Sequence, residues 1–373
     1  MPGRVALLIG TRPEAIKLMP VVRALERAGH PPYVFATGQH RDLLQPILRE
    51  LGIAPLENLD LMTSNQSLGE LSVRILAGVQ VLLRKYRPGI LLLQGDTTSV
   101  AMGALACFYE DVRVGHVEAG LRTHNRRNPY PEEMNRRLAG CMADVHFAPT
   151  EPARQNLLRE GVDPQTVHMV GNTVIDALFL ARDQLVPSLA PDPELERKLD
   201  SGKDLILMTG HRRESFGPDF YAICDGVRRL AREHAGRVQI LYPVHPNPNV
   251  RSVVENELTG IGNVILTEPL SYLRFIQIML RARMIITDSG GVQEEAAALG
   301  IPVLVTRRTC ERLEAVEAGV SQLVGPDADA ILAAASELLL DEKTYHRRAR
   351  PTSAFGDGRA ADRIVGILLE MMR

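Results

Sequence analysis

Three acidic residues in the first half of this sequence stand where acid–base chemistry is possible. Asp96 and Glu118 each follow a short apolar run, and Glu132 lies one helical turn before Arg136. A carboxylate among arginines can take up or release a proton beside a phosphorylated substrate. We therefore take these three acids as candidates for a general acid and a general base.

Each of these acids also has a structural explanation. Asp96 precedes two threonines and could cap the helix that follows. Glu118 with Arg122, and Glu132 with Arg136, have the spacing of an ion pair between neighbouring helical turns. Singly, each acid is better explained in this way. Together in one predicted cleft, they favour acid–base catalysis.

A second kind of candidate site binds phosphate. Ser289, Gly290 and Gly291 follow an apolar run and open a helical pattern, so backbone N–H groups and the helix dipole would face a diphosphate. Glu295 on the same helix could reach ribose hydroxyls. The alternative is that Ser289 only caps the helix and the glycines only form a turn. The spacing alone supports both explanations equally.

Cationic and imidazole side chains follow other apolar runs. Arg12 and Lys17 lie near the start of a helical pattern, where they would oppose the helix dipole, and this favours a bound anion over a surface turn. His211 ends an apolar run and could titrate near neutral pH or hydrogen-bond a phosphate, although a structural histidine is equally consistent. His245 lies in a proline-rich loop, where a structural role is favoured.

Composition and missing motifs exclude several classes of function. The 373 residues are 45% hydrophobic with a net charge of −2, so we expect a globular protein that does not bind nucleic acid. The 4 cysteines lack the spacing of a zinc site or disulfide framework, and no apolar run is long enough to span a membrane. We see no signal sequence and expect a cytoplasmic protein. Motifs of serine hydrolases, zinc proteases, P-loop NTPases and nicotinamide enzymes are also missing.

Short apolar runs alternate with amphipathic helical patterns, which predicts an α/β fold with parallel sheets. A polar stretch at 187–204 separates two such series, so we expect two Rossmann-like domains facing a central cleft. The first covers 1–172, joined by the C-terminal helix 358–373, and the second covers 173–357. Ligands of such sheets bind beyond the carboxyl ends of the strands. The expected strands are 4–10, 32–38, 89–95, 112–118, 145–150, 167–171, 205–210, 238–245, 263–268, 283–291 and 301–306.

At these residues the chain closely resembles the non-hydrolysing UDP-N-acetylglucosamine 2-epimerases, a family with the two-domain GT-B fold of glycosyltransferases. The matching runs are spread over almost the whole chain in family order, which makes the resemblance more specific than any one motif. They are GTRPEAIK, QGDTTS, GHVEAGLRT, PEEMNRR, APTE, GNTVIDAL, TGHRRESFG, YPVHPNPNV, TDSGGVQEE and ERLEAV.

The resemblance implies a cofactor-free, homodimeric enzyme that interconverts UDP-GlcNAc and UDP-ManNAc and so supplies surface polysaccharide synthesis. In the family, UDP leaves by anti elimination to give 2-acetamidoglucal and then adds back, with the proton delivered to the opposite face of C2. The residues that match the family's catalytic groups are Asp96, Glu118, Glu132 and His211. Those that match its contacts to the substrate or UDP are Arg12, Lys17, Arg136, Phe275, Ser289, Gly290, Gly291, Glu295 and Arg312.

Some bacterial members of the family also bind a second UDP-GlcNAc as an activator. The matching positions here are Gln39, His40, Arg74, Arg212, Glu214 and His245. Asp42 replaces a second glutamine of that site, so activation is a weaker inference than epimerisation. Ala297 and the run RRTCER also depart from the usual Pro and RDTTER, but Arg312 is kept.

Three other functions remain open from the sequence. A GT-B glycosyltransferase could share the TDSGG nucleotide site, but it would not need the three acids. A hydrolysing epimerase would release free ManNAc and UDP. A non-enzymatic nucleotide-sugar sensor would use the same acids only as caps and ion-pair partners.

Overall fold

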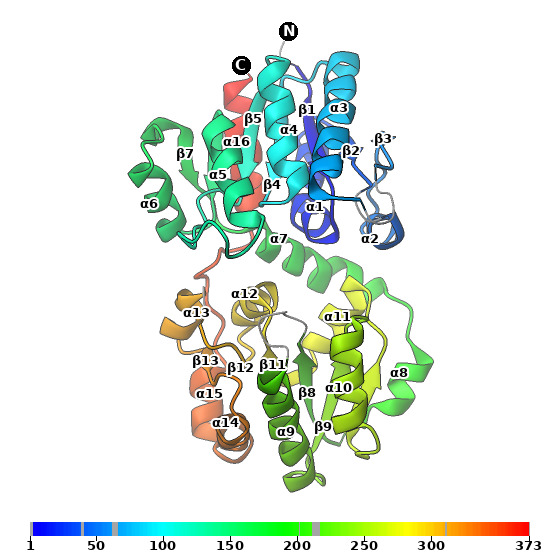
Figure 1. Cartoon of the computed structure of the whole chain (residues 1–373). Helices are drawn as coiled ribbons and strands as arrows, with labels where there is room; N and C mark the ends of the chain where they lie inside the picture. The colour runs from blue at the N-terminus through cyan, green and yellow to red at the C-terminus, as the bar shows by residue number, and fades with distance from the viewer. Residues whose placement is uncertain are drawn as a thin grey trace. The chain divides into compact units, whose positions relative to one another are not determined.

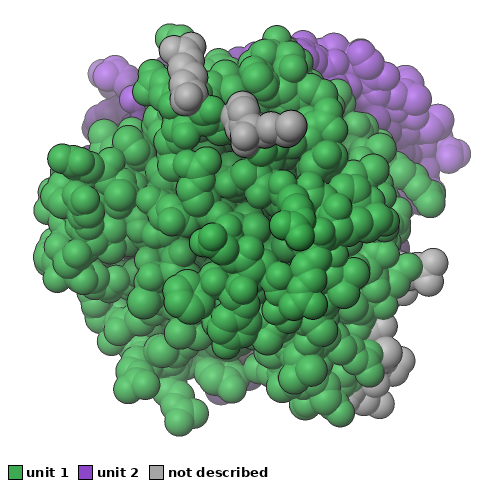
Figure 2. All heavy atoms as spheres, turned by 90° about the horizontal axis from the view of Figure 1, so that it is seen from above, with its two compact units in different colours: residues 1–179, 356–373 green, residues 180–355 purple. Residues whose placement is uncertain are grey.

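The structure, a computed structural model, describes residues 3–38, 41–61, 66–200, 202–210, 217–309 and 312–372. The chain forms two units (Figure 1, Figure 2), of which unit 1 comprises Met1–Phe179 with Gly356–Arg373 and unit 2 comprises Leu180–Phe355. Each unit has its own sheet and helices. The domain limits expected from the sequence stay a prediction.

Unit 1 is built on a parallel sheet whose strands follow the order β3-β2-β1-β4-β5-β6-β7. Helices cover both faces of such a sheet, which explains why its central strands are almost continuously apolar and buried. The strands are β1 Val5–Ile9, β2 Tyr33–Ala36, β3 Glu57–Asn58, β4 Ile90–Gln94, β5 Arg113–Val117, β6 Val145–Ala148 and β7 Val167–Met169.

Three helices of unit 1, α3, α4 and α5, lie side by side (Figure 1), and the helix α16 packs on α1. Buried side chains of α3 and α4 meet those of β1 and β4 in one core that includes Leu8, Ile75 and Leu91. The helices are α1 Arg12–Arg27, α2 Arg41–Glu50, α3 Leu68–Tyr86, α4 Thr98–Tyr109, α5 Glu132–Met142, α6 Glu151–Arg159, α7 Thr173–Leu180 and α16 Ala360–Met371, with the 3-10 turn η1 Pro164–Thr166.

Helix α16 is tied to unit 1 at its first turn. The Asp176 carboxylate on α7 accepts a hydrogen bond from the Ala361 backbone N–H at 2.8 Å. Arg27, in the last turn of α1, pairs with Asp362 at 2.9 Å. An acidic side chain at a helix N-terminus satisfies a free N–H and complements the helix dipole, so Asp176 acts as a cap for α16.

Unit 2 has a second parallel sheet, in the order β10-β9-β8-β11-β12-β13. Its strands are β8 Asp204–Thr209, β9 Val238–Pro243, β10 Val264–Thr267, β11 Ala282–Thr287, β12 Val303–Val305 and β13 Ser321–Leu323. Its helical segments are η2 Ala181–Leu185, η3 Val186–Ser188, α8 Pro193–Lys198, α9 Pro218–Glu233, α10 Pro248–Leu258, α11 Tyr272–Met279, α12 Gly290–Leu299, α13 Leu313–Glu317, α14 Ala328–Leu340 and α15 Glu342–Arg348.

The prediction of an α/β fold with two parallel sheets is confirmed. Every strand expected from an apolar run is present, but two edge strands were missed. The first, β3, is two polar residues long, and β13 has three residues, so neither offers a period-2 pattern or an apolar run to detect. Among the described residues, no helix is long and apolar enough to cross a membrane.

Candidate active site

The first candidate site lies at the carboxyl ends of three neighbouring strands in unit 1. Strand β1 pairs in parallel with β4, and β4 pairs with β5. The turns after these strands therefore meet at one edge of the sheet. They carry Glu14 after β1, Asp96 after β4 and Glu118 after β5, so the topology gathers acids that are far apart in the sequence.

Glu118 is held by one cation and two amides. It is only 8% exposed, and its carboxylate accepts from Lys17 Nζ at 2.5 Å and from Asn172 Nδ2 at 3.2 Å. Gln94, the last residue of β4, donates to the same oxygen as Lys17. The residue has a left-handed φ of 64°, which aims its side chain out of the strand direction. These donors favour an ionised carboxylate in a fixed orientation.

The ion pair predicted between Glu118 and Arg122 is wrong. Arg122 pairs instead with Glu160 on the loop after α6, at 2.7 Å. The spacing of four residues produces a pair only within a helix, whereas 118 to 131 contains no helix and α5 begins at Glu132.

Asp96 is held by an arginine from α5. Arg136 Nη2 donates to its Oδ2 at 2.6 Å, and the Asn135 side-chain amide donates to its backbone carbonyl at 3.0 Å. Although 29% of the Asp96 side chain is exposed, the surrounding protein desolvates it and raises its pKa. The charges of Glu118 and Glu132 also raise that pKa, and Arg136 opposes them.

Asp96 does not cap α4, which corrects one structural explanation from the sequence. Thr97 is the capping residue, and its hydroxyl accepts from the Val100 N–H at 3.3 Å. If Asp96 were the cap, α4 would begin at Thr97, but it begins at Thr98. The Asp96 carboxylate instead accepts a hydrogen bond from Arg136. The pairing of Glu132 with Arg136 is likewise not the one observed, because Arg136 contacts Asp96 and Glu133.

Glu132 is the first residue of α5 and is half-buried. Its charge acts on Asp96, as does that of Glu118, so the three acids form one electrostatic cluster. Arg12 is the first residue of α1, at the same edge of the sheet, and it is also half-buried. The structure thus brings together the predicted acids of unit 1 with Lys17 and Arg136.

Sequence reasoning missed two side chains of this cluster: Glu14 and Asn172. Both are buried, and Asn172 donates to Glu118. Asn172 lies 54 residues from Glu118 in the sequence, so no local pattern could have indicated this contact. Glu14 did have a detectable signal, because Thr11 and Glu14 have the spacing of a capping box.

The second candidate site is the start of α12 in unit 2. Ser289 occupies the N-cap position, but its side chain makes no capping hydrogen bond, which argues against a purely capping role. Its backbone N–H donates to the Thr287 hydroxyl at 2.9 Å. A side chain added at Gly291 would meet no atom of the described residues within 4 Å, so these residues leave space beside the helix start. Such a terminus can bind a diphosphate through its N–H groups.

Arg312 lies beside the same helix start. Its guanidinium lies 3.5 Å from the Cβ position that a side chain at Gly290 would take. Arg312 forms an ion pair with Glu294, which is only 2% exposed. A cation next to a helix N-terminus is opposed by the dipole unless an anion lies between them. Glu294 was missed from the sequence, whereas the predicted neighbour Glu295 is buried on the same helix.

Three other predicted residues lie outside the contacts described above. Phe275 is half-buried on α11, Arg74 is exposed and donates to the Leu61 carbonyl at 3.5 Å, and His245 Nδ1 accepts from the Asn247 N–H at 3.1 Å. The contact of His245 agrees with a role in shaping its loop. The predicted residues that lie outside the described part of the chain are Gln39, His40, His211, Arg212 and Glu214.

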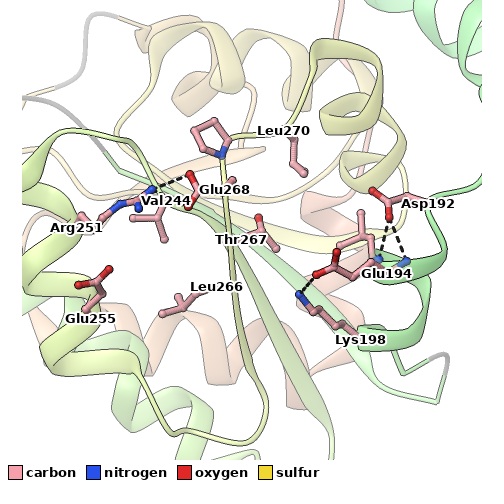
Figure 3. A pocket seen from close by; sticks show the side chains of 12 residues that line it. Asp192, Glu194, Lys198, Val244, Arg251, Glu255, Leu266, Thr267, Glu268 and Leu270 are labelled. Atoms are coloured by element: carbon pink, nitrogen blue, oxygen red, sulfur yellow. Dashed lines mark hydrogen bonds and ion pairs between the residues drawn. The ribbon is translucent and has the colours of Figure 1, made fainter.

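A cavity of about 480 Å³ in unit 2 contains none of the predicted residues (Figure 3). It lies between α8, α10 and the segment after β10. Charged groups of its lining pair with each other, Arg251 with Glu268 at 2.7 Å and Lys198 with Glu194 at 2.7 Å. Among the described residues, no group of His, Cys, Asp and Glu could hold a metal ion.

The fold has the GT-B-like architecture of nucleotide-sugar enzymes. The chain belongs to the UDP-N-acetylglucosamine 2-epimerase family, whose model matches residues 23–369. It is therefore an isomerase, and the resemblance inferred from its motifs is confirmed.

Similar proteins match over almost the whole chain. The UDP-N-acetylglucosamine 2-epimerase of Yersinia pestis is 47% identical and covers 98% of both chains. The structure of UDP-GlcNAc 2-epimerase from Neisseria meningitidis bound to UDP-GlcNAc has a TM-score of 0.90 at 38% identity, covering 98% of this chain and 100% of that one. The Methanocaldococcus jannaschii enzyme in complex with UDP-GlcNAc and UDP has a TM-score of 0.80 at 32% identity, covering 98% and 99%.

Proposed function

We propose that this enzyme interconverts UDP-GlcNAc and UDP-ManNAc by inverting C2, without a cofactor. The observation that carries the proposal is the acid cluster of unit 1, in which Asp96 and Glu118 follow neighbouring strands and the charges of Glu118 and Glu132 act on Asp96. The known substrates of the family's solved members support the same substrate class.

The chemistry at C2 explains why acids are needed. The C2 proton is not next to a carbonyl group, so it cannot be removed to form an enolate. Instead, a base removes it while the C1–O bond to UDP breaks, which leaves a C1–C2 double bond in 2-acetamidoglucal. The reverse addition reforms the C1–O bond and delivers a proton to the other face of C2. The cycle consumes nothing and needs at least two proton-transfer groups.

The two held carboxylates suit different parts of this cycle. Glu118 is fixed by Lys17 and two amides, so it is suited to remain ionised and to act as a base. Asp96 has a raised pKa, which allows it to hold a proton closer to neutral pH. We assign proton transfer to Asp96, Glu118 and Glu132, with His211 as a further catalytic group. Which acid serves which face of C2 is left to experiment.

Binding of the departing UDP is assigned to unit 2. We propose that the N–H groups at the start of α12 and the Arg312 guanidinium neutralise its diphosphate, with Ser289 and Gly290 next to it. Glu295 and Phe275 are assigned to the nucleoside. Charge that develops on the leaving group is stabilised best by donors that are already oriented, and Glu294 orients Arg312.

Turnover in D₂O with NMR detection tests this function. The enzyme is incubated with UDP-GlcNAc in D₂O, and the expected product is UDP-ManNAc with deuterium at C2. Deuterium should also enter recovered UDP-GlcNAc, because the reaction is reversible. Free ManNAc with UDP would show a hydrolysing epimerase. UDP release only when an acceptor is added would show a glycosyltransferase, and no turnover at all would show a binding protein.

We also propose that the enzyme is a homodimer that associates through helices α3, α4 and α5. The outer faces of these neighbouring helices carry large exposed apolar side chains, namely Val73 (67% exposed), Val81 (60%), Phe108 (70%), Tyr109 (59%) and Leu138 (45%). Aromatic side chains such as Phe108 and Tyr109 each offer about 150–250 Å² when fully exposed. A stable complex buries roughly 800 Å² of each partner, so side chains around this patch must take part as well.

A second copy is the occupant that fits this surface best. A two-fold axis can place such a patch on itself, so that each copy covers the exposed apolar side chains of the other. Two further assignments stay predictions: a cytoplasmic location, and a second UDP-GlcNAc as activator through Arg74, His245 and the residues outside the described chain.

A further inference from the structure

Glu14 differs from an ordinary helix-capping glutamate. It is the third residue of α1, is only 2% exposed, and accepts from the backbone N–H of Thr11 at 2.9 Å and from that of Gly10. The same capping box begins α3, where Glu70 accepts from the Ser67 N–H at 2.7 Å. Glu70 is exposed, and its hydrogen bonds are with Ser67 at the start of its own helix. Capping alone therefore does not require the burial of Glu14.

The second carboxylate oxygen of Glu14 contacts the turn that follows β4. Glu14 Oε1 accepts from the Thr97 hydroxyl at 2.5 Å. Thr97 directly follows Asp96 and caps α4. Because β1 and β4 are neighbours in the sheet, one carboxylate connects the turn before Arg12 to the turn that carries Asp96.

The two turns are packed without spare room. A Cβ added at Gly10 would lie 2.4 Å from Ser99 Oγ and 3.1 Å from Glu14 Oε2. Ser99 is itself within hydrogen-bond distance of the Thr37 hydroxyl, at 3.2 Å. The carboxylate of Glu14 therefore has one place to lie, between the backbone of the first turn and the hydroxyl of the second.

The charges around this carboxylate connect it to the acid cluster. The pKa of Glu14 is raised to about 7, with burial as the largest cause; the hydrogen bonds from Thr97, Gly10 and Thr11 oppose this rise, and the charge of Asp96 adds to it. The other charged groups of the cluster are Lys17 on α1, Glu118 after β5, and Glu132 and Arg136 on α5. Ionised Glu14 accepts all three hydrogen bonds, whereas a protonated carboxyl gives up part of that capacity.

We propose that Glu14 is a positioning residue for the reaction, which acts through Thr97 to hold Asp96 in place against the turn Gly10–Arg12. The inference rests on the proposed function. Glu14 itself takes no part in proton transfer at C2. Its removal lets the turn after β4 move, and a misplacement of the reacting group by about 1 Å can cost on the order of 100-fold in rate.

Glu14→Gln and Glu70→Gln form a matched pair for testing this role. Both remove the same charge from the same capping motif, but only Glu14 contacts the turn that carries Asp96. The rate of deuterium entry at C2 and kcat are measured for both variants and the wild type between pH 5.5 and 9, together with KM and Tm. These pH limits are about 1.5 to 2 units either side of neutrality.

The expected result separates the two variants. Glu70→Gln keeps a kcat within about twofold of wild type, whereas Glu14→Gln loses about 10- to 100-fold in kcat with a Tm close to that of Glu70→Gln. Wild type and Glu70→Gln lose activity as the pH falls through about 7, and Glu14→Gln lacks this inflection, since Gln does not titrate. Equal kcat and equal pH profiles in the two variants would overturn the inference.

Two further results are decisive. Wild type without deuterium entry at C2 would refute the proposed function and the inference with it. An active wild type in which the two variants behave alike would refute the inference alone.

If Glu14→Gln does not fold, Thr97→Val and Thr97→Ser replace it. Thr97→Ser keeps the hydroxyl that donates to Glu14 and should retain kcat, while Thr97→Val should lose about 10-fold. Equal rates in this pair would again overturn the inference.

Discussion

The ion pair between Lys17 and Glu118 offers a quantitative test of how unit 1 is held together. The atoms Lys17 Nζ and Glu118 Oε2 lie 2.5 Å apart, and the two side chains are 18% and 5% exposed. We would make Lys17→Met, Glu118→Gln and the double variant. Each substitution removes one charge with little change in volume, so the pair is broken without opening a large cavity.

The expected magnitudes follow from burial and from the remaining partners. Removing one member of a fully buried pair costs about 3–5 kcal/mol, because the other charge is left unpaired. Lys17→Met leaves the more buried charge, but two amides still donate to it, so we expect about 3 kcal/mol. Glu118→Gln leaves a lysine that water can partly reach, and we expect about 2 kcal/mol. The double variant should lose about 3 kcal/mol, which gives a coupling energy of about 2 kcal/mol.

Urea unfolding at one fixed protein concentration measures these free energies, because self-association would otherwise shift the midpoints. The same variants report on catalysis, since Glu118→Gln should lower kcat by about 100- to 10,000-fold if Glu118 acts as an acid or base. If the two single losses simply add to within about 0.5 kcal/mol in the double variant, the pair is not coupled and our reasoning fails. A near-normal kcat for Glu118→Gln would leave Glu118 with a structural role only.

Three further predictions concern other parts of unit 1. Burial lowers the pKa of His116 from 6.5 to about 4. Its neutral form therefore contributes stability that is complete above pH 6.5 and is lost as the pH falls through 4. In urea unfolding measured as a function of pH, His116→Gln should reduce this acid destabilisation by about 3 kcal/mol. Gly120→Ala should cost about 3–4 kcal/mol in the same assay, because the new Cβ would lie 2.1 Å from the Ala153 carbonyl oxygen. Gly161 has a similar positive φ, but its Cβ would meet no described atom within 4 Å, so Gly161→Ala should cost about 1 kcal/mol. Phe108→Asp should convert the dimer into a monomer in sedimentation experiments, and an unchanged dimer would contradict the proposed interface.

The sequence predicted the strands well because both faces of each sheet are covered. Such strands are apolar throughout, as in Leu91 to Leu93, and their ends locate the site by the general rule for parallel sheets. The acids Asp96 and Glu118 were found in this way. Their neighbourhood in the sheet follows from strand order, which the apolar pattern alone does not encode.

The partners of these acids could not be predicted from spacing. Glu118 pairs with Lys17 across 101 residues, and Asp96 pairs with Arg136 across 40. Reasoning from four-residue spacing gave Arg122 as the partner of Glu118, but that rule applies only inside a helix. It also gave Arg136 as the partner of Glu132 on α5, where Arg136 contacts Asp96 and Glu133 instead. Sequence also gave no sign that the Asn172 amide contacts Glu118, since the two residues are 54 positions apart. Contacts of this kind exist only after the sheet has formed.

Helix α16 has a consequence for the order in which the chain folds. It belongs to unit 1, where Asp176 caps it and Arg27 pairs with its first turn. Synthesis must pass through residues 180–355 before α16 emerges, which takes roughly 10 to 35 s at about 5–20 residues per second.

During that interval unit 2, an uninterrupted segment, can complete its own core. Unit 1 stays incomplete until α16 is made, and the surface of α1 that α16 later covers is exposed to water until then. The apolar residues Ile364 and Leu368 then bury against unit 1 and close it. The unit that is made first is therefore finished second, and its exposed face in the meantime is where a chaperone or a premature partner would bind.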